Sequence, residues 1–211
     1  MYALVGGLAA AGYLTSRART RRASSSSCTA SFSLRNMLRI REARPEDAAL
    51  LLSWVKNINA ERNPFLIMEP GEFKMTEEDE KQFLQSCAES ENQAYFLGFV
   101  EDELVGICQM SASDRAKIRH RGKFGLTVVR QYRGQGVGGA LLDHLIAWAR
   151  ANPILTKVEL DVHVDNERAI GLYLSRGFVK EGAVRNAVLI DGQYFDQVCM
   201  GLARAASQGQ T

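Results

Sequence analysis

Residues that build metal centres and disulfide frameworks are scarce in this sequence. The 211 residues include four cysteines and three histidines. The cysteines lie far apart, and neither residue type shows the close spacing of a metal-binding motif. We therefore predict no metal site, and we expect the cysteines to be buried or free thiols of a protein from a reducing compartment.

The sequence also lacks a membrane-spanning run and a strong excess of charge. The apolar stretch at residues 2–14 is shorter than the roughly 20 residues that cross a bilayer. No basic residue precedes it, as one would in a secretory signal. The formal net charge of +2 argues against a nucleic-acid-binding surface driven by bulk charge. We expect a cytoplasmic protein that binds neither membrane nor nucleic acid, and assembly as a homodimer stays open.

Acidic residues are missing from residues 1–36, which contain several arginines and the serine run 24–27. This composition is typical of an organellar transit peptide, which would place the protein in an organelle. The alternative is an unstructured upstream extension before a functional start at Met37. Both alternatives stay open, and both predict disorder for residues 1–36. We also expect the short tail, residues 205–211, to be disordered. The remaining residues, 37–204, have the length of one globular domain.

Helical and alternating apolar patterns predict a mixed α/β domain. Residues 76–79 have the form of a capping box, and Asp191-Gly192 is a strong turn signal between two strands. Helices are expected at residues 44–55, 76–87, 137–150 and 166–175. Strands are expected at residues 38–42, 94–100, 104–110, 125–129, 157–163, 184–190 and 193–201.

A glycine-rich turn between a strand and a helix is the most informative segment. Strand 125–129 leads into residues 130–136, and a helix follows from Val137. The first N–H groups of a helix have no helical acceptor, and the helix dipole places roughly half a positive charge there. Glycines let a ligand approach the backbone closely, and Arg133 adds a full charge at the rim. The segment therefore predicts a cradle for a pyrophosphate group.

Two other phosphate-binding patterns fit this segment less well. A Walker-type loop needs a lysine and a hydroxyl where the helix starts, but this sequence has Gly138-Gly139-Ala140. The dinucleotide pattern G-x-G-x-x-G fits Gly134, Gly136 and Gly139, with acidic residues about twenty positions further on. However, the tetrapeptide 130–133 separates the strand from the glycines, and too little chain follows for a doubly wound sheet. A nicotinamide-binding domain is therefore only a third interpretation.

A second motif lies further along the chain. Residues 166–178 fit Asn-x-x-Ala-x-x-Leu-Tyr-x-x-x-Gly-Phe, while Arg133, Gly136 and Gly138 fit Gln/Arg-x-x-Gly-x-Gly/Ala. In this order, with a strand between them, the two motifs resemble the GNAT superfamily of acyl-CoA-dependent N-acetyltransferases over roughly residues 37–202. The resemblance implies an α/β fold with a mixed, mostly antiparallel central sheet of about six to seven strands, flanked by about four helices.

The resemblance also implies acetyl-CoA as co-substrate and assigns parts of its site. The edge of strand 125–129 would bind the pantetheine arm, with a backbone N–H near Val128 as the oxyanion donor. Tyr173 would be the general acid for the departing thiolate; its alternative role is packing against Ile170 and Phe178. Asn166 would cap its helix and contact CoA. The complete set expected to bind CoA is Val128, Val129, Arg133, Gly134, Gln135, Gly136, Val137, Gly138, Gly139 and Asn166.

The implied reaction is transfer of an acetyl group to a primary amine by direct attack on the thioester. The acceptor stays open among amino acids, polyamines, other small amines and protein N-termini. Many members of the superfamily place a glutamate on the strand before the cradle, and residues 123–127 offer none here. A less basic α-amine would need little help in losing its proton. The missing carboxylate also motivates an alternative function, a CoA-binding module without turnover. The unranked candidates for a general base elsewhere are Glu69, Glu72, Glu159 and His163.

Overall fold

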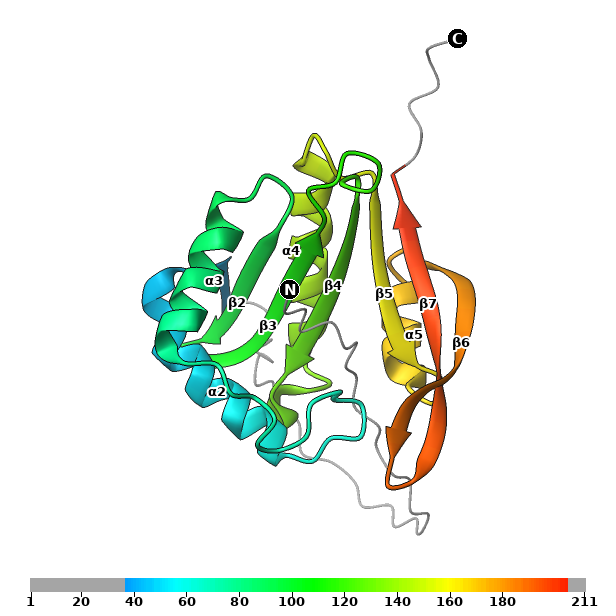
Figure 1. Ribbon diagram of the computed structural model, residues 1–211, viewed down its shortest axis with the longest axis horizontal. Helices are drawn as coiled ribbons and strands as arrows, with labels where there is room; N and C mark the ends of the chain where they lie inside the picture. Colours follow the sequence, from blue (N-terminus) through cyan, green and yellow to red (C-terminus); the bar gives the residue numbers. More distant parts are fainter. Residues whose placement is uncertain (1–36, 205–211) are drawn as a thin grey trace, which may run out of the picture.

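The computed structural model describes residues 37–204, which form a seven-stranded sheet with helices on both faces (Figure 1). The strand order is β1-β2-β3-β4-β5-β7-β6, and only β4 and β5 run parallel to each other. This arrangement confirms the predicted mixed, mostly antiparallel sheet. The elements are β1 (Leu38–Glu42), the 3-10 helix η1 (Pro45–Asp47), α2 (Ala48–Ala60), α3 (Glu77–Glu89), β2 (Ala94–Val100), β3 (Glu103–Ala112), β4 (Arg121–Val128), the 3-10 helix η2 (Arg130–Tyr132), α4 (Val137–Ala151), β5 (Lys157–His163), α5 (Glu167–Leu174), β6 (Val179–Ile190) and β7 (Gln193–Ala203).

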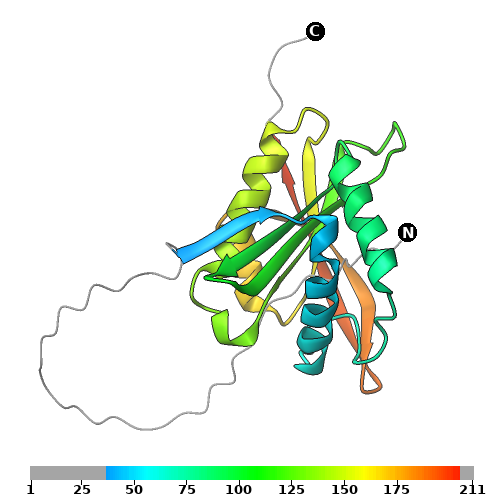
Figure 2. The same cartoon turned by 90° about the vertical axis from the view of Figure 1, so that its left-hand side faces the viewer.

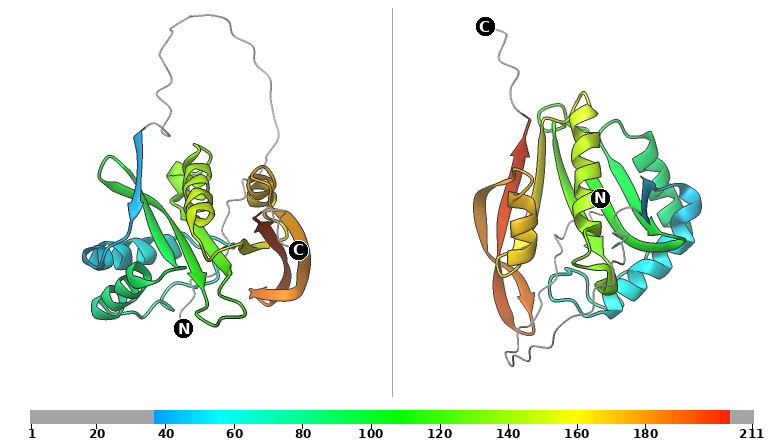
Figure 3. Two further views of the ribbon diagram at one scale, coloured as in Figure 1. Left: turned by 90° about the horizontal axis from the view of Figure 1, so that it is seen from above. Right: turned by 180° about the vertical axis from the view of Figure 1, so that it is seen from behind.

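Two helices lie on each side of the sheet. α2 and α3 cover one face, while α4 and α5 lie on the other (Figures 2 and 3). The predicted apolar stripe of α4 packs onto the strands through Val137, Leu141 and Leu145, all of which are buried. A second apolar core forms between the sheet and α2 and includes Leu51 and Trp54. Since both faces are covered, every residue of β2 is buried.

Two local signals read from the sequence are confirmed at atomic detail. The Asp79 N–H donates to Thr76 Oγ1 at 3.1 Å, and the Thr76 N–H donates to the Asp79 carboxylate at 3.0 Å, which completes the capping box of α3. Asp191 and Gly192 have φ angles of 49° and 80°, as a type I′ hairpin turn requires. These signals depend on neighbouring residues alone.

Several boundaries differ from the prediction, and α2 ends at Ala60, five residues after the expected end. The segment after Arg44 begins as the 3-10 helix η1, because the Asp47 carboxylate accepts the Arg44 N–H and binds Arg41. β4 begins four residues earlier than position 125, at Arg121, where it pairs with β5. β6 begins at Val179 rather than at residue 184, because β7 provides a partner along its length. Both extensions contain polar or exposed positions that conceal a strand in the sequence.

Several expectations concern the ends of the chain and its thiols. The predictions for residues 1–36 and 205–211 lie outside the described residues. Between residues 37 and 204, no helix is long and apolar enough to cross a bilayer. Cys87 and Cys108 are buried free thiols and Cys199 is a half-buried one, as predicted. Cys28 lies outside the described residues.

The parallel strands β4 and β5 pair only where they begin. Residues 121–123 of β4 pair with residues 157–159 of β5, and the two strands then diverge (Figure 1). β4 stays paired with β3, and β5 stays paired with β7. The stretch from Phe124 to Val128 therefore has a backbone edge on the β5 side that no strand of residues 37–204 covers. This edge leads directly into the glycine-rich turn.

Candidate active site

The glycine-rich turn places the N-terminus of α4 at the end of β4. Gly136 is the N-cap of α4, and the first helical hydrogen bond runs from the Ala140 N–H to the Gly136 carbonyl at 3.0 Å. The N–H groups of Val137, Gly138 and Gly139 therefore have no acceptor within the helix. Gly136 has a φ of 90°, and a Cβ there would meet no atom within 4 Å. Its glycine is thus required by the left-handed backbone rather than by lack of space.

Arg133, which was expected to add a full charge at the rim, is held in an ion pair. Its Nε donates to the Val128 carbonyl at 2.7 Å, and its Nη2 is 2.7 Å from Glu61 Oε2. The side chain is only 12% exposed, and this burial lowers the pKa of Arg133. Its charge is compensated by Glu61, so the arginine ties the turn to β4 and to the end of α2.

A different arginine supplies the uncompensated charge at the turn. Arg168 on α5 is exposed, and its Nη2 lies 2.7 Å from the position that a Cβ on Gly134 would occupy. No hydrogen bond or ion pair holds this guanidinium within residues 37–204. The sequence analysis missed Arg168, although it lies inside the second motif at a position the motif leaves variable. The side-chain amide of Gln135, a residue expected to bind CoA, donates to the Gln131 carbonyl at 2.5 Å.

The register of β3 and β4 decides which backbone groups of β4 are available to a ligand. The Val129 N–H donates to the Val105 carbonyl at 2.9 Å, so these residues form a hydrogen-bonded pair. Hydrogen-bonded and non-hydrogen-bonded pairs alternate along an antiparallel ladder. The N–H of Val128 therefore points away from β3, toward the side from which β5 has diverged. Val128 offers its amide to a ligand there, whereas the amide of Val129 is used by the sheet.

Tyr173 and Asn166 both come from the second motif and are almost completely buried. The Tyr173 ring lies 5.8 Å from the rings of Phe124 and Phe178, so it does pack in the core. Its hydroxyl nevertheless has no hydrogen-bond partner within residues 37–204, and burial raises the pKa of Tyr173 well above its ordinary value. Asn166 caps α5 as expected, accepting the Ala169 N–H at 3.2 Å. Its Nδ2 is buried without a partner among the described residues.

The four carboxylate and imidazole candidates for a general base have different surroundings. Glu159 is bound by Arg121 and Lys157, at 2.9 Å and 3.0 Å. Glu69 and Glu72 are both exposed in the loop before α3, where the Glu72 carboxylate accepts the Glu69 N–H at 3.0 Å. His163 is buried between the rings of Phe65 and Phe195, with centroid distances of 5.1 Å and 4.9 Å. None of these groups combines burial with a free carboxylate.

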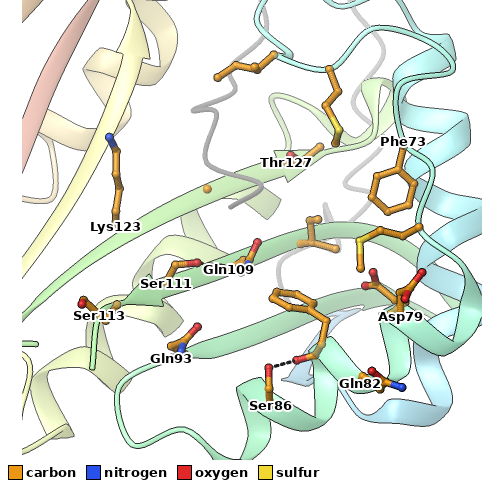
Figure 4. Close-up of a pocket in the computed structure, with 18 of the residues that line it drawn as sticks. Phe73, Asp79, Gln82, Ser86, Gln93, Gln109, Ser111, Ser113, Lys123 and Thr127 are labelled. Carbon is orange, nitrogen blue, oxygen red and sulfur yellow. Dashed lines mark hydrogen bonds between the residues drawn. The ribbon is translucent and has the colours of Figure 1, made fainter. Parts of the chain in front are cut away.

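A large cavity opens on the face of the sheet that carries α2 and α3. It has a volume of about 1150 Å³ and is lined by the loop before α3, by α3 itself and by β3 and β4. Figure 4 shows Gln109 and Ser111 on the strands of its floor, with Asp79 and Ser86 on the helix that borders it. Gly125 and Thr127 of β4 also line the cavity. It therefore reaches the strand whose free edge leads to the turn.

Glu80 lines this cavity and is a second residue, after Arg168, that was not predicted from the sequence. It is only 3% exposed, and burial raises its pKa to about 7. The sequence carried a signal for it, because Glu80, Leu84 and Cys87 have the spacing of one helix face and all three are buried. Its three preceding neighbours, Glu77 to Asp79, are exposed acids of the first helical turn, so Glu80 resembles a fourth exposed acid in the sequence.

Comparisons with known proteins identify the family of this chain. Residues 55–178 match the acetyltransferase (GNAT) family. The chain is 25% identical over 169 residues to the uncharacterized N-acetyltransferase YokL, derived from the SPbeta prophage of Bacillus subtilis, covering 79% of this chain and 90% of that protein. It is 30% identical over 105 residues to the L-amino acid N-acetyltransferase AaaT of Escherichia coli, covering 48% and 62%.

A solved structure extends the likeness to the fold. The acetyltransferase of the GNAT family from Streptococcus pneumoniae superimposes with a TM-score of 0.76 at 34% sequence identity, covering 79% of this chain and 99% of that one. Family match, sequence identity and fold therefore point the same way. The chain belongs to the acetyltransferase (GNAT) family.

Proposed function

We propose that the protein transfers the acetyl group of acetyl-CoA to a primary amine by direct attack on the thioester. The observation that carries this proposal is the continuity of the site. A turn with free amides, the free edge of β4 and a cavity that reaches β4 follow one another without a break. One end suits a pyrophosphate, the middle suits the pantetheine arm and the far end has room for an acceptor.

The residues around the thioester divide the chemistry among them. The Val128 N–H points to the position where the thioester oxygen gains negative charge, and it serves as the oxyanion donor. The Tyr173 hydroxyl is buried, keeps its proton and has no other partner, so it can donate that proton to the departing thiolate. A CoA thiol has an ordinary pKa of about 8.5, which makes the thiolate a modest base and the acid helpful rather than essential.

Relatives do not agree on a single acceptor. Their names include an L-amino acid N-acetyltransferase, a spermidine N(1)-acetyltransferase and a ribosomal-protein-serine acetyltransferase. We infer that the acceptor of this protein is an amino acid, a polyamine, another small amine or a protein N-terminus. The alternative, a CoA-binding module without turnover, was motivated by the lack of a glutamate on the strand before the cradle, and β4 carries none. It is less well supported, because the cavity contains a buried carboxylate on α3, Glu80.

Release of free thiol tests the proposed reaction directly. The full chain is incubated with acetyl-CoA and a panel of amino acids, polyamines and short peptides with free N-termini. We expect thiol release above the rate without amine, together with an acetylated product whose mass is higher by one acetyl group. Binding of acetyl-CoA without thiol release for any amine would favour the non-catalytic alternative.

The charges at the turn give a prediction of their own. Replacing Arg168 with alanine is expected to weaken CoA binding about tenfold, equivalent to about 1.4 kcal/mol, because a charge-assisted contact to phosphate is lost. The melting temperature should not change, since Arg168 has no partner within residues 37–204. Calorimetric titration with CoA measures the affinity.

The matched comparison is Arg133→Ala. This change removes the buried ion-pair partner of Glu61, so we expect a lower melting temperature. Unchanged stability in Arg133→Ala together with unchanged CoA affinity in Arg168→Ala would contradict both assignments.

A further inference from the structure

Glu80 is a buried carboxylate on the inner face of α3, where Leu84 and Cys87 occupy the equivalent positions on the next turns. It forms no ion pair and no hydrogen bond through its side chain within residues 37–204. A buried charge without a partner is costly and rare in proteins. A carboxylate kept in this position, with its side chain on the wall of a cavity, indicates that a ligand supplies the missing partner.

Two further polar groups close to Glu80 are also unsatisfied. The Tyr95 hydroxyl and Gln109 Oε1 are buried and have no hydrogen-bond partner among the described residues. Gln109 lines the same cavity as Glu80, and Tyr95 is the residue of β2 that pairs with Gln109. The charge of Glu80 also contributes to the raised pKa of Tyr95, after the larger effect of burial. A carboxylate and an amide oxygen are acceptors, and a hydroxyl can also accept. An ammonium group has three donors and no acceptor, which matches this set.

The strand register connects this group of acceptors with the free edge of β4. Tyr95 pairs with Gln109, and Gln109 pairs with Gly125, so the three residues form one row across β2, β3 and β4. Neighbouring strands lie about 4.8 Å apart, and the row therefore spans about 10 Å. Gly125 has no side chain, which leaves the β4 end of the row open to the cavity that it lines. An amine held in this row lies beside the strand that would carry the thioester.

We propose that Glu80 binds the ammonium group of the acceptor and takes up the proton that the amine loses before attack. The inference rests on the proposed function and names its acceptor as a cationic primary amine. The ammonium gives one proton to the Glu80 carboxylate, and the freed lone pair forms the bond to the acetyl carbon. The C–S bond breaks with its electron pair on sulfur, which takes a proton from Tyr173. The excess proton on nitrogen returns to Tyr173, and Glu80 releases its proton to water.

The other ionisable groups around Glu80 do not provide a competing partner. The buried face of α2 carries no titratable residue, and Asp47 of η1 is bound to Arg41. Burial, rather than a neighbouring charge, is the cause that raises the Glu80 pKa to about 7. The other titratable residues that line the cavity are Glu72, Lys74, Asp79, Asp114, Arg121, Lys123 and Glu159. The others on α3 are Glu77, Glu78, Lys81, Cys87 and Glu89.

The pH dependence of kcat/KM tests this role, with the most active alkylamine as acceptor. For the native protein we expect kcat/KM to rise up to about pH 7, where Glu80 becomes ionised, and then to level off. Glu80→Gln should lower kcat/KM about 10²-fold at pH 7. The deficit should shrink toward pH 10, where an alkylamine of pKa about 10.4 loses its own proton. It should also be smaller for an α-amine, whose pKa is about 7.7–8.0.

Two control variants separate catalysis from structure. Glu78→Gln changes an exposed carboxylate on the same helix, and it should leave the profile unchanged. Glu80→Asp keeps the charge on a shorter arm, and it should retain the acidic limb with intermediate activity. CoA affinity should be unchanged in all three variants. A Glu80→Gln enzyme with the native profile, or with the same deficit at every pH, would overturn the role of Glu80 while leaving acetyl transfer intact. Absence of turnover by the native protein with every amine would overturn both.

Discussion

Replacing Val128 with proline is expected to lower kcat by about 10²–10³-fold while the fold is retained. Proline removes the N–H that we propose as the oxyanion donor. Proline is tolerated in a strand where the lost N–H faces away from the neighbouring strand, and the β3–β4 register places the Val128 N–H on the free edge. The preceding residue, Thr127, is already in the extended conformation that proline requires of it.

The neighbouring position provides the control for this substitution. Thr127 belongs to a hydrogen-bonded pair with Ile107, so Thr127→Pro removes a bond of the ladder and should lower the melting temperature. Steady-state kinetics and thermal unfolding of both variants measure the contrast. Full activity in Val128→Pro would show that the oxyanion is stabilised elsewhere. Equal unfolding of the two variants would contradict the assignment of the backbone directions.

Replacing Tyr173 with phenylalanine is expected to reduce kcat by about 10²-fold or more without loss of CoA affinity. The change removes only a hydroxyl that has no hydrogen-bond partner within residues 37–204. The ring contacts with Phe124 and Phe178 are preserved, so the melting temperature should be unchanged or slightly higher. Single-turnover kinetics with saturating acetyl-CoA isolates the chemical step.

The pH profile gives Tyr173 a second test. Burial raises its pKa above the ordinary value of about 10. The acid form is therefore present at all lower pH values, and ionisation of Tyr173 should cause no loss of activity up to pH 10. Tyr194→Phe, on an exposed side chain of β7, is the control. If Tyr173→Phe retained native kcat, the tyrosine would have only its packing role.

Local patterns in the sequence predicted most of the fold. The capping box at Thr76, the turn at Asp191-Gly192 and the apolar stripe of α4 each depend on residues within a few positions of one another. The second motif likewise identified a capped helix that carries Tyr173. Such patterns predict structure well because the same few side chains determine both the local backbone conformation and which face of the element is buried.

The features of the site that the sequence did not predict depend on long-range contacts. Arg133 meets Glu61, which lies 72 positions earlier in the chain, and no local pattern indicates that pairing. The direction of the Val128 N–H follows from its register with β3, which only the folded sheet defines. Glu80 is the exception, since the spacing of the α3 inner face was available in the sequence. Its burial could be inferred there, but its place beside Tyr95 and Gln109 could not.

The divergence of β4 and β5 divides the sheet into two parts. One consists of β1 to β4 and the other of β5, β7 and β6, and their backbones share only three residue pairs. A pantetheine arm bound along the gap, as we propose, would connect these two parts of the sheet. Acetyl-CoA should therefore raise the free energy of unfolding. The gain should be about 2.7 kcal/mol at a concentration one hundred times its dissociation constant. Hydrogen exchange of the backbone amides of β4 and β5 along the gap should slow by the corresponding factor when acetyl-CoA is bound.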